Sequence, residues 1–385
     1  MSAFLSRGFR PFFFAAGAFG AGALVFWLVA LTGAAQPPAG MMSARDWHVH
    51  EMLFGYLAAA MSGFLLTAVP NWTGRLPIQG RPLALLAAVW LAGRVAIFFA
   101  AVAPVVAAAL DATYLALLAA LIWREIIAGG NRRNIIVAAI VSAMALANVW
   151  WHIALLTGLP AAPPERLVLA AGAALIMLIG GRIVPSFTRN WLMKQGIRDE
   201  AALPASFGSA DKAASLLAGL ALALWAVAGE DALSAPVMLL AGLALAFRLS
   251  RWKGLKTGRE PLVWILHAGY AWLPAWFVLM ALAGWDLWPL TDALHALTAG
   301  AILVMTLAVM TRASLGHSGR ALTADRITTI IYALAIAGAL ARVLATFLPL
   351  PLMAAWHLAG TLSAAALALF ALRYAPMFFL PRARG

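Results

Sequence analysis

The chain has 385 residues, of which 64% are apolar and only 11% are charged. A soluble globular protein is about half apolar and about a quarter charged, so this composition excludes a soluble enzyme, a disordered chain and a DNA-binding domain. The net charge of +13 does not indicate a nucleic-acid partner, because the basic residues lie in alternate loops between apolar runs. The absence of cysteine excludes disulfides, iron–sulfur clusters and thiolate ligands.

Apolar runs follow one another along the whole chain and predict an all-α polytopic membrane protein, with residues 1–385 forming a single integral membrane domain. We expect twelve transmembrane helices, the seventh and eighth being the shortest. In chain order they are predicted at about 11–33, 48–69, 83–102, 104–123, 134–156, 165–185, 212–228, 233–249, 261–283, 290–311, 327–348 and 351–373.

The basic residues predict how the helices are oriented. Of the 27 Lys and Arg residues, 23 belong to the N-terminus, the C-terminus and the loops on the same side as both termini. Loops rich in Lys and Arg stay in the cytoplasm, so both termini are expected to be cytoplasmic. This sorting of charge also favours an even number of spans.

Histidines are the most informative polar residues, because ionisable side chains within a membrane are costly and usually functional. At about 1.5 Å per residue, five of the seven fall in one layer in the outer half of the membrane. Neutral imidazole suits haem iron, copper and zinc, so this layer predicts a metal or haem centre, with haem iron or copper favoured for a redox site. The candidate ligands in the layer are His48, His50, His152, His295 and His357.

His48 and His50 face opposite ways if their segment is helical, and then they serve different sites; if it is not helical they can converge. Glu51 is three residues from His48, so it is expected to share that face. There it orients the His48 imidazole, relays protons, or simply faces water. Asn148 shares a face with His152 and is a candidate for supporting it.

His267 enters from the inner side of the ninth span and is one turn from Tyr270. The two are candidates for a second, inner cofactor site, for a relay, or for an ordinary contact between helices. The depth estimate places His267 too far inward to share a metal with the outer layer. His317 is expected in a cytoplasmic loop, exposed to water.

Two arginines lie within predicted spans. Arg94 and Asp111 flank a tight turn near residue 103 at equal depth, and they are expected to pair or to support a cofactor. No carboxylate is apparent beside Arg342, which is level with His357. Because an unpaired Arg in lipid is costly, an anionic ligand such as a haem propionate is expected to balance Arg342.

Several long motifs carry a resemblance to a known family. The chain resembles the NnrS family of bacterial inner-membrane proteins in the motifs GFRPFF at 8–13, WHVHEM at 47–52, TAVPNWTG at 67–74, GRIVPSFTRNW at 181–191 and MTRASLGH at 310–317. The resemblance implies a twelve-span protein of the bacterial inner membrane that binds b-type haem and copper. It further implies a role in nitric oxide metabolism and in defence against nitrosative stress, but it does not assign ligands to metals.

Nitric oxide dissolves in lipid, so it can reach a metal centre within the membrane. Its reduction to nitrous oxide would make the protein a membrane oxidoreductase that needs protons, for which Glu51 is the candidate relay, and an unidentified electron donor. Binding without turnover remains open. The main alternative is a twelve-span transporter that uses the histidine layer as a polar pathway, although transporters usually place such groups near the bilayer midplane. A membrane sensor is a third possibility.

Overall fold

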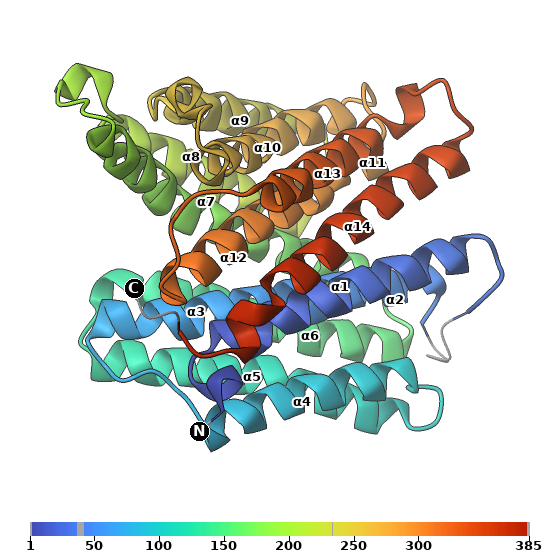
Figure 1. Ribbon diagram of the computed structural model, residues 1–385. Helices are drawn as coiled ribbons and strands as arrows, with labels where there is room; N and C mark the ends of the chain where they lie inside the picture. The colour runs from blue at the N-terminus through green and yellow to red at the C-terminus, as the bar shows by residue number, and fades with distance from the viewer. Residues whose placement is uncertain (1, 37–41, 233, 383–385) are drawn as a thin grey trace. The chain divides into compact units, whose positions relative to one another are not determined.

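The computed structural model describes residues 2–36, 42–232 and 234–382 (Figure 1). Throughout these residues the regular structure is helical, with no strand. Eleven helical segments among them are long and apolar enough to cross a membrane, and one further apolar helix, α9 (Ala235–Ser250), is shorter. The chain is therefore an all-α polytopic membrane protein, as its composition predicts. The side of the membrane on which the termini lie stays a prediction.

Every predicted span corresponds to a helical segment. The first four are α1 (Phe9–Leu31), the continuous segment α2–η2–α3 (Ala44–His50, Glu51–Leu57, Ala58–Thr73), α4 (Arg81–Phe98) and α5 (Pro104–Ala128). The middle four are α6 (Ile135–Thr157), α7 (Ala162–Lys194), α8 (Ser209–Ala228) and α9. The last four are α10 (Pro261–Gly284), the continuous segment α11–η6–α12 (Leu290–His295, Ala296–Ile302, Leu303–His317), α13 (Arg326–Val343) and α14 (Leu352–Phe379). Short 3₁₀ turns lie at Ala3–Leu5, Arg132–Asn134, Glu200–Ala202, Gly254–Thr257 and Ala345–Phe347.

Two helical segments contain a π-helix, a wider turn that is rare and frequently lies at functional sites. The first, η2, follows His50 directly, and the second, η6, follows His295 directly. Both therefore start at a histidine that the depth estimate selects as a candidate ligand.

Contacts between residues divide the chain into two compact units. Unit 1 contains residues 1–171, 310–321 and 364–385, and unit 2 contains residues 172–309 and 322–363. The boundaries cut through α7, α12 and α14, so each unit combines distant parts of the sequence. The prediction of a single membrane domain over 1–385 is not decided by this division.

In unit 1, α4 packs along α5, and α5 packs along α6 (Figure 1). Gly93 of α4 lies directly against Asp111 of α5. A Cβ atom at Gly93 would be 3.2 Å from the Asp111 Cα and 3.3 Å from its Oδ1. This close approach brings the Asp111 carboxylate between the helices.

In unit 2, α10 packs against α9 and against the π-helix η6, which in turn packs against α13. Gly300 of η6 faces the ring of Trp272, and a Cβ atom there would be 2.6 Å from the Trp272 Cδ2. Only a residue without a side chain lets the two segments approach this closely.

The end of α12 differs from the sequence prediction. The helix continues through the basic segment to His317, which is half-buried, with its ring centroid 5.7 Å from that of Phe9. The prediction that His317 lies in a loop exposed to water is therefore wrong. Hydropathy locates where an apolar run ends, whereas a helix can extend beyond it when its end packs against other residues.

Candidate metal centre

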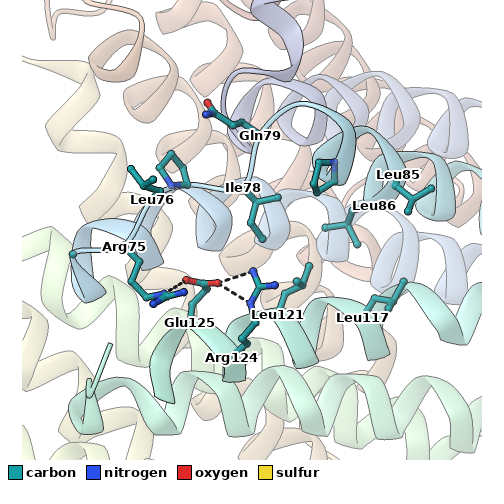
Figure 2. A pocket seen from close by; sticks show the side chains of 13 residues that line it. Arg75, Leu76, Ile78, Gln79, Leu85, Leu86, Leu117, Leu121, Arg124 and Glu125 are labelled. Atoms are coloured by element: carbon teal, nitrogen blue, oxygen red, sulfur yellow. Dashed lines mark hydrogen bonds and ion pairs between the residues drawn. The ribbon is translucent and has the colours of Figure 1, made fainter. Parts of the chain in front are cut away.

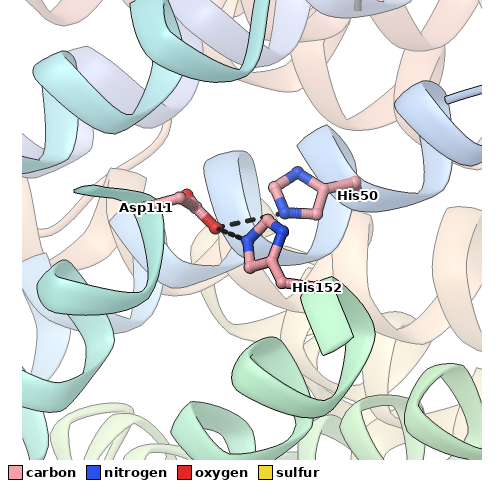
Figure 3. A group of neighbouring side chains, drawn as sticks. All are labelled: His50, Asp111 and His152. Carbon is pink, nitrogen blue, oxygen red and sulfur yellow. Dashed lines mark hydrogen bonds and ion pairs between the residues drawn. The ribbon is translucent and has the colours of Figure 1, made fainter. Parts of the chain in front are cut away.

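Three buried side chains of unit 1 converge on one point from three helical segments (Figure 3). His50 ends α2, Asp111 lies in α5 and His152 lies in α6. The Asp111 Oδ2 is 3.1 Å from the His50 Nε2 and 2.8 Å from the His152 Nε2. Two imidazole nitrogens and a carboxylate oxygen in this arrangement form a donor set for a transition metal.

A ring of charged groups surrounds the three side chains. Arg94 forms an ion pair with the Asp111 Oδ1 and donates from Nη1 to the Glu51 Oε1 at 2.7 Å. The same Glu51 oxygen is 2.9 Å from the His50 Nδ1. The side chains of Glu51, Asp111 and Arg94 are between 1% and 4% exposed, so their formal charges amount to one buried negative charge when the histidines are neutral. A bound cation would balance that charge.

The partners of His50 favour metal binding by its Nε2 atom. A metal-binding histidine commonly donates its other ring N–H to a carboxylate, which fixes the tautomer and the ring orientation. Glu51 is placed to accept such a bond from the His50 Nδ1, which leaves the Nε2 lone pair directed at the Asp111 side. His50 and Glu51 together thus have the geometry of a ligand and its supporting carboxylate.

Unsatisfied polar atoms next to the three side chains indicate room for another ligand. Asn148 donates from Nδ2 to the Asp111 Oδ2 at 2.8 Å, but its own Oδ1 is buried without a hydrogen-bond partner. The Trp151 Nε1 is likewise buried without a partner, and the Trp151 ring lies 6.2 Å from the ring of His50. Buried groups of this kind are costly unless something satisfies them, so the residues fit a metal that carries a further ligand.

The structure decides between the alternatives for the motif at 47–52. The segment is helical, and His48 and His50 contact different groups, since the His48 ring stacks on Trp27 with centroids 4.5 Å apart. Of the alternatives left open for Glu51, orientation of the His48 imidazole is not the one seen, because Glu51 contacts His50 and Arg94. The reason is the change to a π-helix at Glu51, where the usual three-residue spacing of an α-helical face no longer applies.

Sequence reasoning found part of the centre. The pairing of Arg94 with Asp111 is confirmed, and the common depth of His50 and His152 agrees with their meeting. Asp111 was considered only as a partner for Arg94, so its position between the two histidines was missed. A carboxylate within an apolar run, level with two candidate ligands, was the signal that pointed to it.

The remaining candidates lie in unit 2 and make other contacts. The His267 Nε2 is 2.7 Å from the Thr188 Oγ1, and the Tyr270 hydroxyl accepts from Arg248 at 3.4 Å. The His295 Nδ1 is 2.6 Å from the Thr291 carbonyl oxygen. His357 is half-buried on α14. Their roles as ligands stay predictions.

The expectation that Arg342 has no carboxylate beside it is wrong. Arg342 donates from Nη1 to the Asp292 Oδ1 at 2.6 Å, and Asp292 is buried. Asp292 is distant in sequence and belongs to the short helix α11, so reading along α13 and α14 alone does not reveal it. Arg342 therefore needs no anionic ligand to balance its charge, although a role next to a cofactor stays a prediction.

A separate groove in unit 1 lies between the loop after α3 and the helices α4 and α5 (Figure 2). Its volume is about 770 Å³, and its lining is mainly apolar. At one end, Glu125 accepts from Arg75 at 2.6 Å and from Arg124 at 2.7 Å. None of the predicted site residues lines it, and a groove of this character suits a lipid chain better than a metal.

Comparison with known proteins agrees with the motifs. Residues 3–382 match the family model described as NnrS protein, which leaves only a few residues at each end outside the match. No curated protein matches the chain. With nearly the whole chain covered, the protein belongs to the NnrS family.

Proposed function

We propose that this membrane protein binds nitric oxide at a metal held by His50, Asp111 and His152, and that it serves nitric oxide metabolism and defence against nitrosative stress. The observation that carries the proposal is the buried donor set of two imidazoles and one carboxylate. Membership of the NnrS family supports nitric oxide as the ligand. A reduced copper or iron ion at this position would supply an open coordination position for the gas and an electron.

The side chains around the donor set have distinct proposed roles. His50 and His152 supply nitrogen ligands, and Asp111 supplies an oxygen ligand while its other oxygen holds Arg94. Arg94 pairs with both Asp111 and Glu51 and offsets one of their two negative charges. The apolar surroundings admit nitric oxide, which is weakly polar, and restrict entry of water and ions.

Turnover to nitrous oxide needs more than the gas. Two molecules of nitric oxide, two electrons and two protons give one nitrous oxide and one water. We propose Glu51 as the last proton donor, since it is buried, contacts His50 and is the only carboxylate besides Asp111 in contact with these three side chains among the described residues. The electrons would come from an unidentified donor, with b-type haem as the second cofactor beside copper.

The proposal also covers the surroundings of the protein. We infer a multi-pass position in the bacterial inner membrane, with lipid around the apolar helices and both termini in the cytoplasm. The proposed function involves no nucleic-acid partner.

The test is anaerobic addition of nitric oxide to the purified, reduced protein after iron and copper have been supplied. Metal content per chain, electron paramagnetic resonance and nitric oxide consumption would be measured together. In the wild type we expect an electron paramagnetic resonance signal from metal-bound nitric oxide. The signal should be lost in His152→Ala and kept in Asp46→Asn, which removes a carboxylate of α2 outside the centre. A wild-type protein with bound metal that gives neither a nitric oxide signal nor consumption would refute the proposal.

A further inference from the structure

The groove of unit 1 between the loop after α3 and the helices α4 and α5 has an apolar part and a charged end. Leu85 of α4 and Leu117 of α5 are exposed and line the apolar part. Both helices are long and apolar enough to cross a membrane, so exposed leucines on them meet lipid chains. The groove volume of about 770 Å³ is that of a typical ligand pocket. The apolar part therefore suits an acyl chain.

The charged end of the groove carries a surplus positive charge. It is formed by Arg75 from the loop after α3 and by Arg124 and Glu125 near the end of α5 (Figure 2). Glu125 is the only carboxylate among the residues that line the groove, so the two guanidinium groups exceed it by one charge. The side chains of Arg75 and Arg124 are 43% and 59% exposed, whereas that of Glu125 is 8% exposed. The surplus charge is thus accessible to a ligand in the groove.

The hydrogen bonds of Glu125 hold both guanidinium groups in place. Its Oε2 accepts from the Arg75 Nε at 2.6 Å, and its Oε1 accepts from the Arg124 Nε at 2.9 Å and from the Arg124 Nη2 at 2.7 Å. Among the described residues, the two terminal nitrogens of Arg75 and the Nη1 of Arg124 have no hydrogen-bond partner. Guanidinium N–H groups match the oxygens of a phosphate in geometry. The pair therefore keeps several donors for a phosphate.

The order of polar and apolar groups along α5 is that of a phospholipid. Leu121 and Leu117 precede Arg124 by three and seven residues, so they lie about 4.5 Å and about 10.5 Å farther along the helix. The arginines stand near the helix ends, where lipid headgroups are found, and the leucines lie deeper in the span. A ligand with a charged head and a long apolar chain fits both parts of the groove at once.

We propose that the groove binds a phospholipid with an anionic headgroup, whose phosphate contacts Arg75 and Arg124. Its acyl chain lies along Leu85, Leu117 and Leu121. A phosphodiester with an uncharged headgroup carries one negative charge, which equals the surplus positive charge at this end. A zwitterionic phospholipid adds an ammonium group and leaves that surplus uncompensated. Basic pockets between membrane helices bind anionic headgroups for this reason. The inference concerns a site separate from the metal centre and does not depend on the proposed function.

The test is native mass spectrometry of the full-length protein in detergent, with phosphatidylglycerol or phosphatidylethanolamine of the same acyl chains added. We expect the wild type to bind phosphatidylglycerol about fivefold more tightly or better. Arg75→Gln should abolish that preference, because the remaining Arg124 and Glu125 cancel. Arg75→Lys, which keeps the charge, should retain most of it. Arg133→Gln is the matched control, because it removes an exposed arginine beyond the same end of α5 that does not line the groove.

A variant of the apolar part tests the acyl chain. Leu117→Trp should fill the groove and weaken the binding of both lipids several-fold, and inorganic phosphate at the concentration of the lipid should not displace phosphatidylglycerol. Unchanged lipid binding in Leu117→Trp, or full displacement by inorganic phosphate, would overturn the position of the chain. Equal affinity of the wild type for the two lipids would overturn the anionic headgroup. An equal loss of preference in Arg133→Gln and Arg75→Gln would show general attraction by basic residues and refute a site in the groove.

Discussion

The two segments that contain a π-helix place the same residue types, a histidine, an aspartate and an arginine, in different contacts. In unit 1, Asp111 faces Arg94 and two imidazoles at once, so three side chains that can bind a metal meet at one point. In unit 2, Asp292 is used by Arg342 and Thr346, and His295 turns to a backbone carbonyl. Each segment has a histidine before its π-helix, so the two places differ in the partners of the carboxylate and not in the presence of a histidine.

The ion pairs Arg94–Asp111 and Arg342–Asp292 also differ in how deeply the arginine is buried. The side chain of Arg94 is 4% exposed and that of Arg342 is 13% exposed, while both aspartates are 1% exposed. Removing one partner of a buried pair leaves an uncompensated charge, and the cost rises with burial. The unit 1 pair should therefore be the more sensitive to substitution.

The largest effect is expected from Asp111→Asn. This nearly isosteric change removes a proposed ligand and leaves the Arg94 charge balanced by Glu51 alone, so the non-haem metal should be lost and the free energy of unfolding should fall by about 3–5 kcal/mol. Metal analysis and thermal unfolding in detergent would measure both. Asp46→Asn serves as the control, because Asp46 is outside the three converging side chains and its side chain is 24% exposed. Full metal content in Asp111→Asn would contradict the ligand assignment.

Asp292→Asn should be milder. Arg342 keeps some access to its surroundings and its stacking on Trp356, so we expect a loss of about 1–3 kcal/mol in the same unfolding measurement and no loss of the non-haem metal. The comparison between units would fail if this variant lost that metal while Asp111→Asn retained it.

The two glycines of the π-helices offer a third contrast. A Cβ atom at Gly55 would lie 2.6 Å from the Phe19 ring and 3.1 Å from the Arg94 Nη1, whereas one at Gly300 would meet only the Trp272 ring among its nearest neighbours. Alanine should cost about 1–3 kcal/mol of stability at either position by overpacking. Gly55→Ala should also lower metal affinity, because it displaces Arg94. Gly22→Ala is the matched control, since nothing lies within 4 Å of its added Cβ.

The sequence predicts the helices far better than the contacts between them. Long apolar runs locate all twelve segments, because the length of a span and its hydropathy are local properties. The partners of Glu51 and Arg342 were missed for non-local or irregular reasons. Glu51 stands where α-helical spacing changes to that of a π-helix, and the partner of Arg342 comes from a helix about fifty residues earlier in the chain. Periodicity reports which residues share a face, but only packing shows which faces meet.

The smallest effect is expected at an exposed pair, Arg189 and Glu200, which lies at the end of α7 and the loop after it. The hydrogen bond from Arg189, 2.9 Å between its Nη1 and the Glu200 Oε2, lowers the pKa of the Glu200 carboxyl. A carboxyl whose pKa is lower in the folded state adds stability above its unfolded pKa of about 4.3, and that stability is lost as the pH falls through the folded pKa. Glu200→Gln should therefore lower the unfolding temperature slightly at pH 7, but not at a pH below the folded and unfolded pKa values of Glu200.

Salt should distinguish this exposed pair from the buried one. Because water and salt screen an exposed pair, the effect of Glu200→Gln at pH 7 should shrink in high salt, whereas the loss of stability in Asp111→Asn should persist. Equal sensitivity of the two variants to salt would show that burial does not separate these ion pairs in the way the structure indicates.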